Sequence, residues 1–445
     1  MQYCFKQPPD HNHFFQLNLQ ETNKMPADFS TDLSFAQETD AADELAAFKQ
    51  SFHFPQKNGK DVIYFCGNSL GLQPKNAETA VQTELNSWKQ EAVGGYFAGE
   101  NPWLYYQEYL KAPLAKLVGC KETEVTVMNT LTVNLHLLML SFYRPTKERY
   151  KIMMEAGAFP SDQYAVETLV KHFGLDPADA IIEIAPEEGE KLLRTEKITA
   201  AIEKNAGSLA MVLFGGIHYY TGQLMDMQHI MAVAHEAGAI AGFDLAHVVG
   251  NVPLQLHNWG VDFAAWCSYK YLNGGPGAVG GVYVHEYFSA NTNTPRLAGW
   301  WGNEESTRFK MEKGFVPKTN ASGWNISTAQ VFNTVCTKAA LELFEEAGID
   351  KLRAKSIQLT AYLEYLVRQL PDLKCEIITP KDPEQRGAQL SLYFTENGKA
   401  IHDKMIENGI VVDYREPGVI RVAPAPLYCS FTDLHRFYSI LKDHF

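Results

Sequence analysis

The stretch VDFAAWCSYKYLN, residues 261–273, decides the fold class, because it places Lys270 directly after an apolar run typical of a buried strand. A second apolar run, AIAGFDLAH at residues 239–247, ends in Asp244 and carries His247 three residues later. Open α/β sheets bind their ligands at the carboxyl ends of their strands. The two runs therefore predict an amine, a carboxylate and an imidazole close together at one edge of a sheet.

These three groups favour a site for pyridoxal phosphate. A lysine amine forms a Schiff base with an aldehyde, and a carboxylate keeps a pyridine nitrogen protonated, so that the ring accepts electrons. Plainer interpretations stay open from the residues alone. In these, Lys270 is a surface side chain, Asp244 caps a helix that begins at Leu245, and His247 is a hydrogen-bonded core residue.

Strand-like and helix-like segments alternate on both sides of this region. Apolar runs occupy residues 125–128, 150–154, 181–185, 209–214, 239–243, 261–267 and 279–284. Helical periodicity is clearest at residues 161–173, 196–204 and 227–237. Such alternation predicts an α/β fold with a mostly parallel, seven-stranded sheet covered by helices on both faces.

The pattern changes after about residue 328. Two long helices are predicted at residues 329–347 and 350–369, before short strands near 374–379, 389–394, 410–414 and 419–423 and helices at 398–408 and 431–443. We therefore expect a smaller α+β domain. The expected division is a flexible tail at residues 1–25, an N-terminal segment at 26–75 packing on the small domain, a large cofactor-binding domain at 76–325 and the small domain at 326–445.

Two other strand ends carry polar groups. MNTLTVNLHLLMLSF, residues 128–142, has the pattern of a strand leading into a helix near Thr132, whose free N–H groups and hydroxyl would hold a phosphate. In AFPSD, residues 158–162, Phe159 can stack on a planar ring. Simple helix caps explain both motifs equally well.

Arg421, in RVAPAPLY at residues 421–428, follows a short predicted strand of the small domain. A guanidinium can bind a carboxylate through two parallel hydrogen bonds. A surface ion pair is the plainer interpretation.

One motif points elsewhere. GPGAVG, residues 275–280, matches the dinucleotide fingerprint G-x-G-x-x-G, which requires a helix after the glycines. Here the glycines lead into GGVYVH, which has the pattern of a strand, and Pro276 has no N–H to offer a phosphate. We therefore expect a glycine loop beside the lysine that leaves room for cofactor and substrate.

Composition narrows the classes of partner. The net charge of −13 over 445 residues disfavours nucleic acid and anionic membrane surfaces. The seven cysteines are widely spaced and form no C-x-x-C pair, as expected for a reduced, cytoplasmic protein. No apolar run approaches the ~18 residues of a membrane span, and we expect no signal peptide. The sequence predicts no metal site.

Several runs together resemble the kynureninase family from about residue 44 to the end of the chain. They are YFCGNSLGLQP (64–74), NTLTVNLHLLMLSF (129–142), FPSD (159–162), HYYTG (218–222), GFDLAH (242–247), WCSYKYLN (266–273), STRFKM (306–311) and RVAPAPLY (421–428). The resemblance implies a fold-type-I pyridoxal phosphate enzyme that works as a homodimer with a shared active site. It also implies hydrolysis of L-kynurenine to anthranilate and L-alanine, or of 3-hydroxykynurenine to 3-hydroxyanthranilate, in tryptophan catabolism or NAD synthesis.

The resemblance also implies roles for individual residues. Lys270, Tyr269 and Asp244 would be catalytic. The other implied cofactor contacts are Leu131, Thr132, Phe159, Pro160, Ser161, Asp162, His247, Thr328 and, from the partner subunit, Trp300. The implied substrate contacts are Arg421, which would hold the carboxylate, and Ser69, Tyr96 and Thr328.

Three positions depart from the family pattern. Gly215 stands where members often have Ser or Thr, Thr328 where animal-type members have Asn, and Tyr96 where they have His. Because that Asn helps to recognise the 3-hydroxyl group, we expect a preference for kynurenine itself.

Two alternatives remain: a cysteine-desulfurase-like lyase, which would need a catalytic thiol in the small domain, and a non-catalytic cofactor-binding protein. The candidate thiols are Cys336, Cys375 and Cys429.

Overall fold

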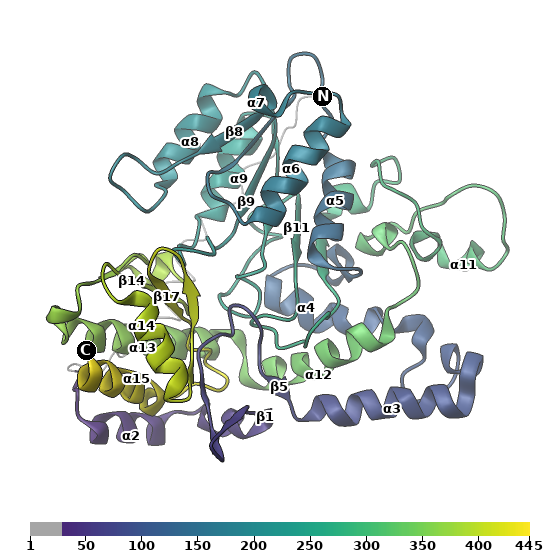
Figure 1. The fold of residues 1–445 in the computed structure, drawn as a ribbon. Helices are drawn as coiled ribbons and strands as arrows, with labels where there is room; N and C mark the ends of the chain where they lie inside the picture. Colours follow the sequence, from purple (N-terminus) through teal and green to yellow (C-terminus); the bar gives the residue numbers. More distant parts are fainter. Residues whose placement is uncertain (1–28) are drawn as a thin grey trace.

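A seven-stranded sheet lies at the centre of the larger part of the molecule (Figure 1), in a computed structural model that describes residues 29–445. Its strands are β6 (Val125–Val127), β7 (Lys151–Glu155), β8 (Ile181–Ile184), β9 (Leu209–Gly215), β10 (Ile240–Asp244), β11 (Phe263–Trp266) and β12 (Gly281–Val284). The order is β6-β12-β11-β10-β9-β7-β8, and only β12 runs antiparallel to its neighbours. The predicted mostly parallel seven-stranded sheet is confirmed. The predicted tail at residues 1–25 lies outside the described residues.

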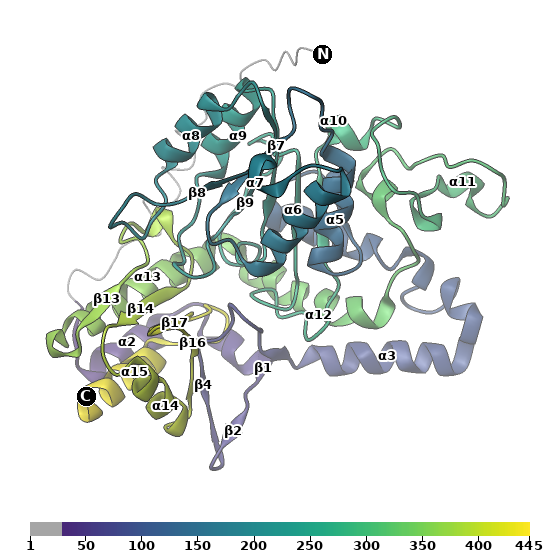
Figure 2. The same cartoon turned by 45° about the horizontal axis from the view of Figure 1, so that its top comes forward.

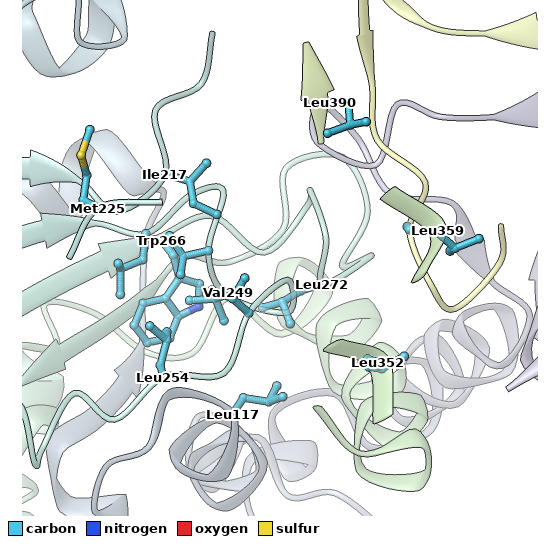
Figure 3. Close-up of a cluster of buried hydrophobic side chains, with 14 of the residues drawn as sticks. Leu117, Ile217, Met225, Val249, Leu254, Trp266, Leu272, Leu352, Leu359 and Leu390 are labelled. Atoms are coloured by element: carbon cyan, nitrogen blue, oxygen red, sulfur yellow. The ribbon is translucent and has the colours of Figure 1, made fainter. Parts of the chain in front are cut away.

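Helices cover both faces of this sheet, because its strands are apolar on both sides. Side chains of β9 alternate, so that Met211 and Leu213 face one layer of core and Val212 and Phe214 the other. The first layer includes α5 (Leu131–Phe142) and α6 (Pro160–His172); the second includes α4 (Lys111–Val118), α8 (Thr195–Lys204) and α9 (Met227–Glu236). Figure 3 shows part of the second layer, where Trp266 packs among Leu117, Val249 and Leu254.

The C-terminal part forms a smaller α+β unit. Its elements are α12 (Val331–Ala347), α13 (Ile349–Arg368), β13 (Cys375–Ile377), β14 (Leu390–Phe394), α14 (Gly398–Glu407), β15 (Ile410–Val411), β16 (Asp413–Arg415), β17 (Val419–Val422) and α15 (Phe431–His444). Four of these strands make an antiparallel sheet in the order β13-β14-β17-β16.

The predicted single strand at residues 410–414 is two strands. β15 leaves the small sheet and pairs in parallel with β4 (Ile63–Tyr64), whereas β16 pairs with β17. The N-terminal segment therefore contributes a strand beside the C-terminal unit, and α2 (Leu33–Ala42) packs on α15. The long helix α3 (Asn76–Glu91) lies along α12 (Figure 2).

The remaining elements are short. They are β1 (Phe52–His53), β2 (Gln56–Lys57), β3 (Lys60–Asp61), β5 (Gln73–Pro74), α7 (Pro177–Ala180), α10 (Glu286–Ser289), α11 (Glu305–Arg308) and several single turns of 3-10 helix. Within the described chain, no helix combines the length and apolar character needed to cross a membrane.

The glycine loop enters strand β12, as expected, and opens no helix. A Cβ on Gly281 would lie 2.1 Å from the Trp266 ring, so only glycine fits there. The loop does not border the lysine's pocket, however: Gly277 accepts a hydrogen bond at 2.7 Å from Asn333 of α12. Gly275 and Gly277 adopt positive φ angles of 86° and 73°, which favour glycine, whereas Gly280 and Gly281 allow close packing.

Candidate functional site

A cavity of about 360 Å³ opens at the carboxyl ends of β7, β9 and β10. Residues 66–71 and the small sheet close its other side. The predicted site residues that line it are Ser69, Leu131, Thr132, Phe159, Ser161, Asp162, Asp244, His247, Tyr269, Lys270 and Arg421. The fold thus brings together side chains that lie more than 350 residues apart in the chain, from Ser69 to Arg421.

Lys270 lies at the centre of this cavity. Its Nζ is 3.0 Å from Nε2 of His247 and within 6.0 Å of the ring centroids of Phe159 and Tyr269. Burial, and then the charge of Lys270, lower the pKa of His247 far below its ordinary value. His247 is therefore neutral at physiological pH and accepts a hydrogen bond from the lysine amine.

Three buried carboxyl groups form the floor of the cavity. Asp244 ends β10, and its Oδ1 accepts a 2.7 Å hydrogen bond from the Ala246 N–H. Burial raises the pKa of Asp244, while Lys270 and a hydrogen bond with Asp162 oppose that rise. The pKa of Asp162 is raised by its own burial and by Asp244, so that Asp162 is the partner that keeps its proton. The third carboxyl group belongs to Glu155, at the end of β7.

The N-terminus of α5 faces the cavity from another side. The helix begins at Leu131, one residue earlier than expected, and Thr130 is its N-cap, without a capping hydrogen bond from its side chain. The first N–H groups of an α-helix have no partner within the helix. They are therefore available to an anionic group placed beside Leu131 and Thr132.

Arg421 lies under the opposite wall and is only 2% exposed. Its guanidinium bonds Asp413, the Tyr219 carbonyl at 2.8 Å and the Ser69 hydroxyl at 3.3 Å. Arg415 reaches the same aspartate at 2.8 Å and also lines the cavity. Two guanidinium groups and one carboxylate therefore leave a net positive charge at this wall.

Four predicted site residues do not line the cavity of this chain. Trp300 is 47% exposed, and its indole N–H donates to the Arg308 carbonyl at 3.2 Å. Tyr96 packs edge-on against Trp103, with ring centroids 5.6 Å apart. Thr328 precedes α12, and Pro160 is the first residue of α6. The expected cofactor and substrate contacts of these residues stay predictions, because the cavity of one chain is lined without them.

Sequence reasoning did not single out several lining residues. Glu155 directly follows the apolar run at 150–154, Tyr219 lies inside the HYYTG run, and Asn68 precedes Ser69. These three residues are therefore next to, or within, motifs that the sequence analysis used. Arg415 had no local signal, because its approach to the cavity depends on the pairing of β16 with β17.

These features fit pyridoxal phosphate. The helix N-terminus suits its phosphate, and the amine of Lys270 suits its aldehyde. Phe159 offers an aromatic face, and Asp244 offers a carboxylate for the ring nitrogen. Moreover, Nδ1 of His247 and Oε2 of Glu155 have no hydrogen-bond partner among residues 29–445, as expected of a site that is completed by a ligand.

A separate cluster, of Glu124, His257 and His285, has one potential metal-binding atom from each residue within 4.8 Å of the others. These atoms already have partners: Glu124 accepts from His257 at 2.9 Å, and Nδ1 of His285 accepts from the Tyr287 N–H at 3.1 Å. The hydrogen bonds give the cluster a structural role, joining the turn before β6 to α10.

A family model and the sequences of similar proteins indicate the same family for this chain. The family described as the kynureninase C-terminal domain matches residues 352–441. A protein named kynureninase from Flavobacterium psychrophilum is 52% identical over 93% of this chain and 98% of its own length. One from Myxococcus xanthus is 50% identical over 94% of this chain and 98% of its own length.

Solved structures share the fold at much lower identity. The cysteine desulfurase of Thermococcus onnurineus NA1 superposes with a TM-score of 0.72 at 18% identity, over 86% of this chain and 94% of its own. A variant of C-DES with glycine covalently linked to its pyridoxal phosphate cofactor gives 0.71 at 18% identity, over 85% and 96%. At this identity the likeness shows the fold alone, and the expected fold-type-I architecture is confirmed.

Proposed function

The chain belongs to the kynureninase family, and from that premise we infer what each part of the cavity does. The enzyme is a pyridoxal phosphate-dependent hydrolase that acts on a carbon–carbon bond. Its reaction is the cleavage of L-kynurenine to anthranilate and L-alanine. The observation that carries this conclusion is identity of about half over nearly the whole chain, joined to a cavity in which Lys270, His247 and Asp244 meet.

We assign the cofactor's parts to residues by their chemistry. When bound, pyridoxal phosphate supplies an aldehyde for Lys270 and a ring that draws negative charge from the neighbouring carbon. The N-terminus of α5 would hold the phosphate, Phe159 would offer its face to the ring, and Asp244 would hold the proton on the ring nitrogen. Neutral His247 keeps Nζ of Lys270 in place without adding a second positive charge.

Proton transfers fall to Lys270 and Tyr269. Lys270 takes the proton from the substrate carbon that bears the amino group. Burial, and then Cys267, raise the pKa of the Tyr269 phenol, so that this group keeps its proton and serves as a donor. Water adds to the ketone carbon, and the bond from that carbon to the neighbouring methylene breaks. Anthranilate leaves, and the methylene gains a proton to become the methyl group of alanine. Lys270 returns a proton to the carbon that bears the amino group.

The substrate carboxylate binds at the positive wall. Arg421 is held at Asp413 and the Tyr219 carbonyl by bonds of 2.8–3.0 Å, whereas its bond to Ser69 is longer, at 3.3 Å. A carboxylate can therefore replace Ser69 as the acceptor without moving the guanidinium. Arg415 supplies a second positive charge at the same wall.

The active enzyme is a homodimer in this proposal. The segment from 297 to 316 exposes Leu297, Trp300, Phe309, Met311 and Val316. Several exposed apolar side chains within one segment are typical of a protein interface. Trp300, Tyr96 and Thr328 would then complete the cavity of the partner subunit, which explains why they do not line their own.

A cytoplasmic location is supported by the six described cysteines, which are unpaired.

The test is direct. Purified protein supplied with pyridoxal phosphate and L-kynurenine should form anthranilate and alanine in equal amounts, and Lys270→Ala should form neither. Cysteine as substrate should release no sulfide. The thiols of Cys336, Cys375 and Cys429 all lie outside the cavity, and burial raises the pKa of each. Sulfide release without anthranilate would overturn the assignment in favour of the desulfurase alternative.

A further inference from the structure

Glu155 is a buried acid to which the reaction assigns no task. Its side chain is 4% exposed at the end of β7 and borders the cavity. Oε1 accepts a 3.0 Å hydrogen bond from the Gly215 N–H, whereas Oε2 has no partner among the described residues. A buried carboxyl group with an unused oxygen is unfavourable unless something else in the site compensates for it.

Gly215 provides the space that this carboxyl group occupies. A Cβ at position 215 would lie 3.0 Å from Oε1 of Glu155, closer than side chains ordinarily approach. Strand β9 lies between β7 and β10, and Gly215 is paired with Asp244 in the parallel register. Glu155 and Asp244 therefore lie on either side of a residue without a side chain.

The charges around Glu155 come from three elements. Its pKa is raised to about 7, chiefly by burial and in part by the charge of Asp244 on β10, while hydrogen bonds from backbone N–H groups oppose the rise. Asp162 on α6 adds a third carboxyl group, and Lys270 after β11 is the cation that acts on Asp244. Without a cofactor, the floor carries more acid groups than one lysine can balance.

We propose that Glu155 is a positioning residue for the cofactor: its carboxylate lies in the space left by Gly215 and, with Asp244, stabilises the positively charged ring nitrogen. Asp162 donates its proton to Asp244, so Asp244 and Glu155 are the two groups that can carry negative charge. A cation placed at Asp244 favours the ionised form of both.

The inference deepens the proposed function but is tested without substrate, so failure of kynurenine cleavage would not decide it. Cofactor-free protein is titrated with pyridoxal phosphate, and the dissociation constant is measured by tryptophan fluorescence. Glu155→Gln keeps the shape and removes the charge. It should weaken binding about tenfold, the size expected for one nearby charge at the effective dielectric of a protein. The melting temperature of the cofactor-free variant should not fall.

A matched control is Glu183→Gln, an exposed glutamate on the neighbouring strand β8, which should bind the cofactor as the parent does. The role of Gly215 is tested by a double-mutant cycle. Gly215→Ala should weaken binding a few-fold in the parent and have no further effect beside Glu155→Ala. Unchanged affinity in Glu155→Gln would overturn the proposal, as would affinity and melting temperature that fall together, or additive effects in the cycle.

Discussion

Asp413 holds Arg421 in a buried ion pair, with Oδ2 2.8 Å from Nη2 and Oδ1 3.0 Å from Nε. Burial alone would raise the pKa of Asp413, but Arg421 and Arg415 outweigh it and the pKa is lowered. The aspartate is therefore charged throughout the neutral range. The guanidinium proposed to bind the substrate carboxylate is thus fixed in place before any substrate arrives.

Replacing this aspartate should affect both folding and binding. Asp413→Asn leaves Arg421 buried without a counter-charge, which should destabilise the protein by about 3 kcal/mol and raise KM for kynurenine. Thermal unfolding and steady-state kinetics measure the two effects. Asp403→Asn, which breaks an exposed ion pair with Lys399 on α14, is the control and should change neither. Equal behaviour of the two variants would show that Asp413 does not hold Arg421.

The two arginines should differ in their contributions. Arg421→Gln removes the fixed guanidinium and should raise KM roughly tenfold to a hundredfold, as expected for a charged hydrogen bond worth about 1.5–3 kcal/mol. Arg415 is 42% exposed in its side chain, and among residues 29–445 its guanidinium bonds only Asp413. Arg415→Gln should raise KM several-fold and leave the melting temperature unchanged. A larger effect of Arg415→Gln than of Arg421→Gln would reverse the assignment of the carboxylate site.

The contrast between these arginines shows where sequence reasoning stops. Lys270 and Asp244 were predictable because Asp244 ends one strand and Lys270 follows the next, and adjacent parallel strands place their ends together. Arg415 was not predictable, because a predicted strand at 410–414 proved to be β15 and β16, which pair with different partners. Trp300 was recognisable only by family resemblance, since its own chain places it outside the cavity.

Glu155 should also affect the stability of the cofactor-free protein in a pH-dependent way. Its pKa is about 7 in the folded protein, against about 4.3 when unfolded. The folded state therefore holds the proton more tightly, and the stability this gives is complete below pH ~4.3 and lost as the pH rises through 7. The Glu155→Gln variant has no titrating carboxyl group at this position, so its stability does not fall in this pH range for that reason. The stability advantage of this variant over the parent in urea unfolding should grow between pH 5 and pH 8, towards roughly 4 kcal/mol at most. A constant difference across this range would contradict the prediction.

Thr328 should contribute to the choice of substrate. An asparagine at this position can hydrogen-bond a ring hydroxyl, and sites built to bond a hydroxyl discriminate strongly against ligands that lack it. Thr328→Asn should therefore raise the ratio of kcat/KM for 3-hydroxykynurenine to that for kynurenine, by about tenfold if one bond worth ~1.4 kcal/mol is gained. Thr395→Asn, at the end of β14, is the control. An unchanged ratio would show that Thr328 does not face the substrate ring.

Subunit exchange tests whether the active site is shared. Lys270→Ala and Trp300→Ala homodimers should each be inactive or nearly so, since every site lacks one required residue. If Trp300 serves the partner's cavity, a mixed dimer places both defects in one site and leaves the other intact. Random reassociation makes half of the dimers mixed, so the mixture should recover about a quarter of parental activity in a two-fold symmetric dimer. The recovered activity should keep the parental KM. If Trp300 served its own chain instead, each site of a mixed dimer would carry one defect, and mixing would restore nothing.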